Sequence, residues 1–153
     1  MIQLVDEFFG TRRDPRQISV NEETMATLKQ IHPSTMSEKA NKNGPIAWVM
    51  VIPTTREVMN RFIKKNITEG ELLAETVPGQ QYEALYLCSA LVLPEYRGKG
   101  YAKRLVGKAI RSIRKNHPIK YLYVWAFSNE GKRLASYVAK EFGLPLKRRV
   151  DKR

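Results

Sequence analysis

The sequence predicts an α/β fold of the α+β type, with a mixed β-sheet flanked by helices. The segments 83–93 and 120–127 are apolar on both faces, which is typical of strands inside a sheet. The segment between them has an amphipathic helical pattern, and such a helix joins neighbouring parallel strands by a right-handed crossover. The chain has 153 residues, which fits a single domain, 1–153.

Two elements are expected before residue 54. The segment 21–33 has apolar side chains at helical spacing, with Asn21 as a cap and Pro33 as a stop, so it is predicted to be a helix. The segment 45–54 is rich in residues that favour strands and is predicted to be one.

Two short helices are predicted in the segment 54–80. Thr54 and Glu57 stand at capping-box spacing, and Thr68 and Glu71 repeat that spacing before the next apolar residues. Apolar side chains at helical spacing follow the first pair.

Two longer helices are predicted in the second half of the chain. Apolar side chains recur at helical spacing from Ala102 to Ile113, with lysines and arginines opposite them. The segment 129–143 is the second helix, with Gly143 as its C-terminal stop, and 144–150 has room for one short strand.

The formal net charge of +12 predicts attraction to an anionic partner. Nucleic acid, anionic lipid and a phosphorylated cofactor or substrate all fit the charge alone. No surface pattern of interleaved aromatic and basic residues favours nucleic acid, so that partner is not expected. No apolar stretch approaches the ~20 residues of a membrane span, so no membrane partner is expected either.

Cysteine and histidine content excludes two further classes of site. Cys88 is the one cysteine, which excludes an internal disulfide, and the two histidines show no zinc spacing, so no metal is expected. The first ten residues include acidic side chains where a secretory signal would be positive, which predicts a cytoplasmic protein.

A glycine-bearing basic loop lies between the strand at 83–93 and the following helix. Gly98 and Gly100 have no side chains, so a ligand can approach the backbone N–H groups closely. The first turn of a helix leaves about four N–H donors without a partner and concentrates positive charge there. The pattern therefore predicts a phosphate-binding loop.

The order Arg97-x-x-Gly100-x-Ala102 after a buried strand resembles the acyl-coenzyme A signature of the GNAT superfamily of N-acyltransferases. The preceding Leu-Pro-Glu-Tyr is similar too, and the resemblance covers about residues 84–143. It implies a GNAT-like fold, with a sheet whose central parallel strands splay apart, and acetyl-CoA as cosubstrate. The loop matches neither a dinucleotide fingerprint nor a Walker loop.

The resemblance also implies which residues bind acetyl-CoA. The pyrophosphate would lie on the loop, and the pantetheine arm would pair with the preceding strand. A main-chain N–H near Leu91 or Val92 would bind the thioester oxygen. The residues expected to bind the cosubstrate are Ala90, Leu91, Val92, Arg97, Gly98, Lys99, Gly100, Tyr101, Ala102, Lys103 and Asn129.

Tyr137 is the candidate catalytic acid, because the family usually places a tyrosine in the last helix after a cofactor-binding asparagine. Here Tyr137 follows Asn129 by eight residues, where seven is usual. One extra residue turns a helical side chain by about 100° unless a residue such as Gly131 absorbs it. A role as an ordinary aromatic residue therefore stays open for Tyr137.

No carboxylate is secured as the base. Many family members use a glutamate early on the strand before the loop, where the match here is Ala84 and the adjacent residue is Glu83. Glu83 qualifies as catalytic base only if a bulge turns it to the other face of the sheet. Glu57 and Glu75, or ordered water, are alternatives. Cys88 is expected to be a small core residue.

Two departures from the family pattern lead to further expectations. The segment 54–80 replaces a short turn and is expected to lie near the acceptor site. Only one short strand fits after Gly143, which leaves a sheet edge and favours a homodimer.

The sequence thus supports an N-acetyltransferase that moves an acetyl group from acetyl-CoA to a primary amine of unidentified acceptor, by direct attack in a ternary complex. A non-catalytic acyl-CoA-binding regulatory domain is the alternative, because the base is not identified.

Overall fold

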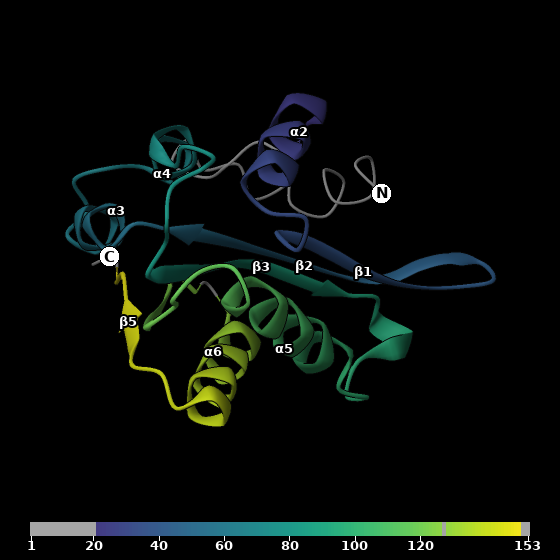
Figure 1. Ribbon diagram of the computed structural model, residues 1–153. Helices are drawn as coiled ribbons and strands as arrows, with labels where there is room; N and C mark the ends of the chain where they lie inside the picture. Colours follow the sequence, from purple (N-terminus) through teal and green to yellow (C-terminus); the bar gives the residue numbers. More distant parts are fainter. Residues whose placement is uncertain (1–20, 127, 151–153) are drawn as a thin grey trace.

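A five-stranded mixed sheet forms the centre of the computed structural model, which describes residues 21–126 and 128–150. The strand order is β1-β2-β3-β4-β5 (Figure 1). The first two pairings are antiparallel, and the β3–β4 and β4–β5 pairings are parallel. The strands are β1 Met36–Asn41, β2 Gly44–Thr54, β3 Ala84–Val92, β4 Tyr121–Val124 and β5 Leu146–Arg148. The predicted mixed α/β fold is confirmed.

Helices cover both faces of this sheet (Figure 1). On one face lie α2 Glu22–Ile31, α3 Arg56–Ile63 and α4 Glu69–Glu75. On the other face lie α5 Tyr101–Arg114 and α6 Asn129–Phe142, and a short 3-10 turn, η2 Pro94–Tyr96, precedes α5. Among the described residues, no helix has the length and apolar character needed to cross a membrane.

The helix caps agree with the sequence in three places and differ in one. Asn21 caps α2, Gly143 ends α6 in a left-handed conformation, and Thr68 and Glu71 form a complete capping box on α4. The prediction that Thr54 caps the next helix is wrong, because Thr55 does so. Thr54 is the last residue of β2, where it pairs with β3 and its hydroxyl lies 2.7 Å from the Tyr123 hydroxyl.

The strand β1 was not predicted from the sequence. Its residues Met36–Asn41 read MSEKAN, and the last four are exposed, so they show no apolar alternation. The turn that joins β1 to β2 consists of Lys42 and Asn43, and Gly44, at φ +120°, is the first residue of β2 and pairs with Asn41. A two-residue loop between antiparallel strands makes a tight hairpin.

The central strands β3 and β4 part halfway along β3. They pair only from Ala84↔Tyr121 to Leu87↔Val124, although β3 continues to Val92. On the other edge of β3, the register with β2 shifts between Met50 and Val51, so that Cys88 has no partner across the ladder. Such a bulge bends a strand and increases its twist. The predicted strand 120–127 therefore ends early, and residue 127 lies outside the described residues.

The predicted pair of helices in 54–80 is confirmed, and both helices pack into the core. The Phe62 ring makes edge contacts with Tyr86 and Trp125, with centroids 5.0 and 5.9 Å away. The Arg149 guanidinium, just after β5, lies 4.6 Å from the Phe62 ring and 4.5 Å from the Trp125 ring. Its Nη1 donates to the Ile67 carbonyl at 2.9 Å. Arg149 thus ties the α3–α4 segment to the end of the sheet.

We expect Arg149→Ala to destabilise the fold by about 3 kcal/mol, because it removes cation–π contacts, buried packing and the donor to a buried carbonyl. Urea unfolding followed by circular dichroism measures this change. The matched control is Arg148→Ala, because Arg148 is exposed and donates only to the Ser136 hydroxyl among the contacts described. A loss no larger than that of the control would contradict the anchoring role.

Candidate active site

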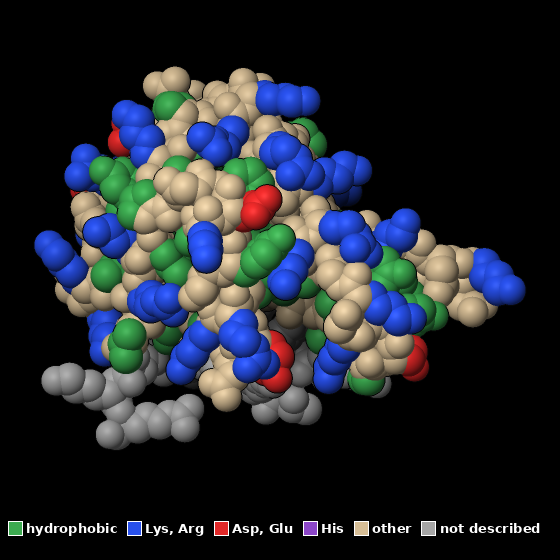
Figure 2. Space-filling view, turned by 90° about the horizontal axis from the view of Figure 1, so that it is seen from below, with side chains coloured by type: hydrophobic (Ala, Val, Ile, Leu, Met, Phe, Trp, Pro, Cys, Tyr) green, Lys and Arg blue, Asp and Glu red, His purple; other side chains and the backbone are tan. Residues whose placement is uncertain are grey.

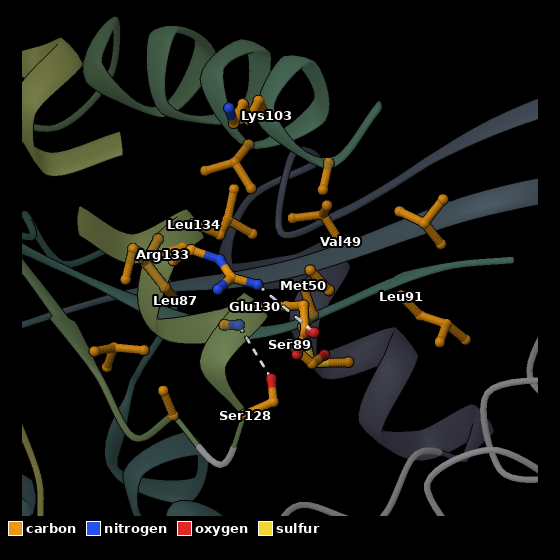
Figure 3. Close-up of a pocket in the computed structure, with 18 of the residues that line it drawn as sticks. Val49, Met50, Leu87, Ser89, Leu91, Lys103, Ser128, Glu130, Arg133 and Leu134 are labelled. Carbon is orange, nitrogen blue, oxygen red and sulfur yellow. Dashed lines mark hydrogen bonds and ion pairs between the residues drawn. The ribbon is translucent and has the colours of Figure 1, made fainter. Parts of the chain in front are cut away.

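A cavity of about 770 Å³ lies where β3 parts from β4. Its walls come from the middle of β2, the second half of β3, the loop before α5, the first turn of α5 and the first half of α6. Figure 3 shows Leu87, Ser89 and Leu91 on the strand side, and Leu134 and Arg133 on the α6 side.

The cavity reaches both faces of the sheet. Gly98 and Lys103 line it from the face covered by α5 and α6, and Glu69 lines it from α4, which covers the opposite face (Figure 1). Because the strands are not paired beyond Leu87 and Val124, the space passes between them. The cavity is therefore lined by residues from both layers of helices at this point.

The loop before α5 needs glycine at two positions. Gly98 has φ +79° and Gly100, the N-cap residue of α5, has φ +81°, in the left-handed region that other residues rarely adopt. A Cβ atom built on Gly98 meets no atom within 4 Å, whereas one built on Gly100 lies 3.1 Å from Arg104 Nη1. Both glycines line the cavity and keep side chains out of its mouth.

The amides of this loop form a row of donors. The first helical hydrogen bond of α5 runs from the Arg104 N–H to the Gly100 carbonyl at 3.1 Å, so the amides of residues 101–103 have no helical acceptor. Within the part of the chain that the structure describes, the amides of residues 98–100 make no backbone hydrogen bond either. These amides and the helix dipole together suit an anion.

One edge of β3 also offers its backbone to the gap. The Leu93 N–H donates to the Ile46 carbonyl of β2 at 3.0 Å. Because backbone groups alternate between the two edges of a strand, the N–H groups of Ala90 and Val92 point toward the gap and that of Leu91 points toward β2. The Val92 carbonyl accepts from Arg97 Nε at 3.1 Å. Of the two amides predicted near the reacting oxygen, the geometry favours Val92.

Basic side chains surround the loop. Lys103 Nζ lies 4.2 Å from the centre of the Tyr137 ring, and Arg104 Nη1 donates to the Lys99 carbonyl at 3.0 Å. Figure 2 shows the face of the molecule on which α5 and α6 lie, where there are more lysine and arginine side chains than acidic ones. The positive field therefore lies on the side where the loop amides are exposed.

The cavity brings together most of the cosubstrate residues predicted from the sequence, but not all of them. The predicted residues that line it are Ala90, Leu91, Val92, Arg97, Gly98, Gly100, Tyr101, Ala102, Lys103 and Tyr137. Lys99 and Asn129 are exposed and do not line the cavity. The Lys99 ammonium instead lies 5.6 Å from the Tyr96 ring.

Tyr137 lies on the side of α6 that faces the cavity, with 43% of its surface exposed. The residue seven positions before it is Glu130, which also lines the cavity, as does Leu134 between them. Seven residues are almost two whole helical turns, so these three share one stripe, whereas Asn129 is turned away by about 100° relative to Glu130. Ser128, the N-cap residue of α6, lines the cavity in its place.

The acids considered from the sequence lie elsewhere. Glu83 is outside the cavity, with its carboxylate 3.8 Å from Lys120 Nζ. The bulge that could turn its side chain lies at Cys88, five residues further along β3. Glu57 and Glu75 are exposed on α3 and α4 and do not line the cavity.

Glu69 is the carboxylate that sequence analysis missed. It is the first residue of α4, it lines the cavity, and only 5% of its surface is exposed. The Tyr86 hydroxyl donates a hydrogen bond to its Oε2.

Among the described residues, no group of three or more His, Cys, Asp or Glu side chains could hold a metal ion.

The environment of Glu69 shifts the pKa values of two neighbours. Burial, and then the nearby charge of Glu69, raise the pKa of Tyr86 well above its ordinary value. The same two causes raise the pKa of the Cys88 thiol well above its ordinary value, and a hydrogen bond to Glu69 adds to the shift. Both groups are therefore protonated donors at neutral pH.

The raised pKa predicts that Cys88 reacts slowly with alkylating reagents, because only the thiolate is nucleophilic. At pH 8 we expect iodoacetamide to label the folded chain at least about tenfold more slowly than the urea-unfolded chain. The labelling rate of the unfolded chain should level off near pH 9, while that of the folded chain keeps rising. A folded-chain rate that levels off at the same pH would contradict the shift.

Comparison with known proteins agrees with this geometry. A family model described as the acetyltransferase (GNAT) family matches residues 5–143. A comparison with curated proteins finds no match. The match spans most of the chain and includes the loop, the parted strands and α6. The chain therefore belongs to the GNAT family of acetyltransferases.

Proposed function

We propose that this protein is an acetyl-CoA-dependent N-acetyltransferase that acts on a primary amine. Membership of the family supports acetyl transfer in general. The observation that carries the proposal is the row of loop amides at residues 98–103, placed at the mouth of a cavity that enters the gap between β3 and β4.

The residues at this mouth fit the diphosphate of acetyl-CoA. Gly98 lines the cavity, and a Cβ atom built on it meets no atom within 4 Å, so there is open space beside it for a ligand. Arg97 and Lys103 line the same mouth and add positive charge. Lys99 and Asn129 lie at the surface beside it, and we keep them as outer contacts of the proposal.

The proposed chemistry uses main-chain and side-chain donors of this chain. Acetyl-CoA supplies a thioester, whose carbonyl carbon is attacked directly by the amine in a ternary complex. The Val92 N–H, which points into the gap, would stabilise negative charge on the carbonyl oxygen. The Tyr137 hydroxyl would donate a proton to the departing sulfur.

A non-catalytic acyl-CoA-binding domain is the second candidate, and it shares the same loop. The two candidates behave differently once the cosubstrate is bound, since only an enzyme releases free thiol when an amine is added. An amine panel that includes alkylamines, polyamines, aminoglycosides and peptide N-termini separates them.

We expect acetyl-CoA to raise the melting temperature of the protein, and Gly100→Ala to weaken that binding about tenfold to a hundredfold. The added Cβ would lie 3.1 Å from Arg104 Nη1 at a residue of φ +81°, so the loop must shift, and each charge-assisted hydrogen bond that its amides would make to the diphosphate is worth about 1.5–3 kcal/mol. Thermal shift against acetyl-CoA concentration measures the affinity.

The matched control is Gly79→Ala. Gly79 has φ +91°, has open space around it and does not line this cavity, so the variant bears the same backbone strain without touching the site. Equal affinities for the two variants would count against the loop as the binding site. Binding without thiol release on any amine would favour the non-catalytic candidate.

Tyr137→Phe tests the proton donor. The phenylalanine ring retains the contact with Lys103, so we expect acetyl-CoA affinity to change less than about twofold while kcat falls about a hundredfold. Initial rates of thiol release with the best amine of the panel give both values. An unchanged kcat would remove Tyr137 from the chemistry.

A further inference from the structure

Glu69 is a buried acid that the cap of its own helix does not need. Among the acidic residues that the structure describes, Glu69 alone is buried. The capping box of α4 is completed by Glu71, so the helix already has an acid in its first turn. Burial of a carboxylate costs several kcal/mol unless specific contacts offset it, so an acid retained inside a cavity calls for an explanation in the chemistry of that cavity.

The carboxylate lies next to the opening in the sheet. Its partner Tyr86 is one residue before Leu87, where pairing with β4 stops, and Cys88 is the bulge residue that follows. Glu69 therefore lies at the level where the gap begins, on the face opposite to the loop of residues 98–103. An acceptor bound on the α3–α4 side of the gap would therefore lie next to Glu69.

The contacts of Glu69 orient it as an acceptor of protons. The Tyr86 hydroxyl donates to it, the Cys88 thiol lies close to it, and neither group has lost its proton at neutral pH. The hydrogen bond from Tyr86 fixes the position of the carboxylate and stabilises its ionised form. An alkyl amine is mostly protonated at neutral pH, because its pKa is about 10, and it must lose a proton before it can attack.

We propose that Glu69, supplied by the α3–α4 segment, is the catalytic residue that accepts a proton from the acceptor ammonium. This inference rests on the proposed N-acetyltransferase function and deepens it. The ammonium transfers one proton to the Glu69 carboxylate, and the nitrogen lone pair then forms the C–N bond to the thioester carbon. As the C–S bond breaks, the sulfur gains a proton from Tyr137 and the nitrogen loses its second proton, which restores Tyr137 by way of solvent. The net products are an amide, a thiol and one proton, which Glu69 releases to water.

The same placement defines the acceptor class. A carboxylate is the charged group that α4 brings to the cavity, so it attracts a cationic primary amine and disfavours an acceptor with an acid beside the amine. The basic α5–α6 face lies across the sheet from α4 (Figures 1 and 2), which separates the binding of the anionic donor from that of the cationic acceptor.

The test compares Glu69→Gln with Glu71→Gln, a matched control on the same helix. Glu71 is exposed and outside the cavity, and glutamine is able to replace it in a capping box. With the best amine of the panel, we expect kcat to fall about a hundredfold or more in Glu69→Gln and to change less than about twofold in Glu71→Gln. Acetyl-CoA should still raise the melting temperature of both variants.

A pair of small amines distinguishes proton removal from a structural role. Ethylamine is mostly protonated at neutral pH, whereas 2,2,2-trifluoroethylamine is mostly neutral because its fluorine atoms withdraw electrons. Loss of a base should slow the reaction of ethylamine about a hundredfold and that of its fluorinated counterpart only a few-fold. A role in packing alone would slow both amines equally.

Each outcome decides the proposal. A full rate in Glu69→Gln, equal losses for the two amines, or loss of acetyl-CoA binding in that variant would each overturn it. Absence of thiol release by the wild-type chain on every amine would instead overturn the proposed function, and this inference with it. Should Glu69→Gln not fold, Glu69→Asp retains the charge but withdraws the carboxylate by one methylene, and we expect about a tenfold loss, again larger for ethylamine. A full rate in Glu69→Asp would overturn the proposal.

Discussion

The early end of pairing between β3 and β4 is the constraint on which the whole site depends. Strand edges inside a protein normally satisfy one another, and an unpaired backbone group in the interior is costly. Beyond Leu87 and Val124, β3 and β4 no longer pair. One of the unpaired groups has a side-chain partner, because Arg97 Nε donates to the Val92 carbonyl. A ligand with its own amide groups would satisfy the rest of this edge, so the gap is also a binding surface.

The two sides of the gap are built by different parts of the chain. The face that suits an anionic donor comes from one continuous run, from β3 through the loop to α5 and α6. The opposite face is completed by the α3–α4 segment, whose Phe62 packs on Tyr86 and Trp125. Packing in the core therefore places the segment against the sheet, with Glu69 next to Tyr86.

Much of the fold was predictable from the sequence, because its elements have strong local patterns. The strand β3 and the helix α5 follow from an apolar run and an amphipathic stripe, and the loop between them from its glycines. The strand β1 was not predicted because its side chains are mostly polar and exposed, so its sequence shows no alternation of apolar residues. Glu69 was not predicted as a site residue for a different reason. An acid in the first turn of a helix is ordinary, and only the contact with Tyr86, 17 residues away, places it inside a cavity.

The contact between Arg149 and the Ile67 carbonyl has a consequence for the order of assembly. These residues are 82 positions apart, so their contact closes a long loop, and contacts of high sequence separation tend to form late. Ile67 lies just before α4. The hairpin and the β3–α5–β4 crossover are able to assemble from nearer neighbours, while the segment that holds Glu69 gains its contact with Arg149 only after β5 has joined the sheet. In a nascent or partly folded chain, the loop of residues 98–103 would then form before the wall of the cavity that carries Glu69 is complete.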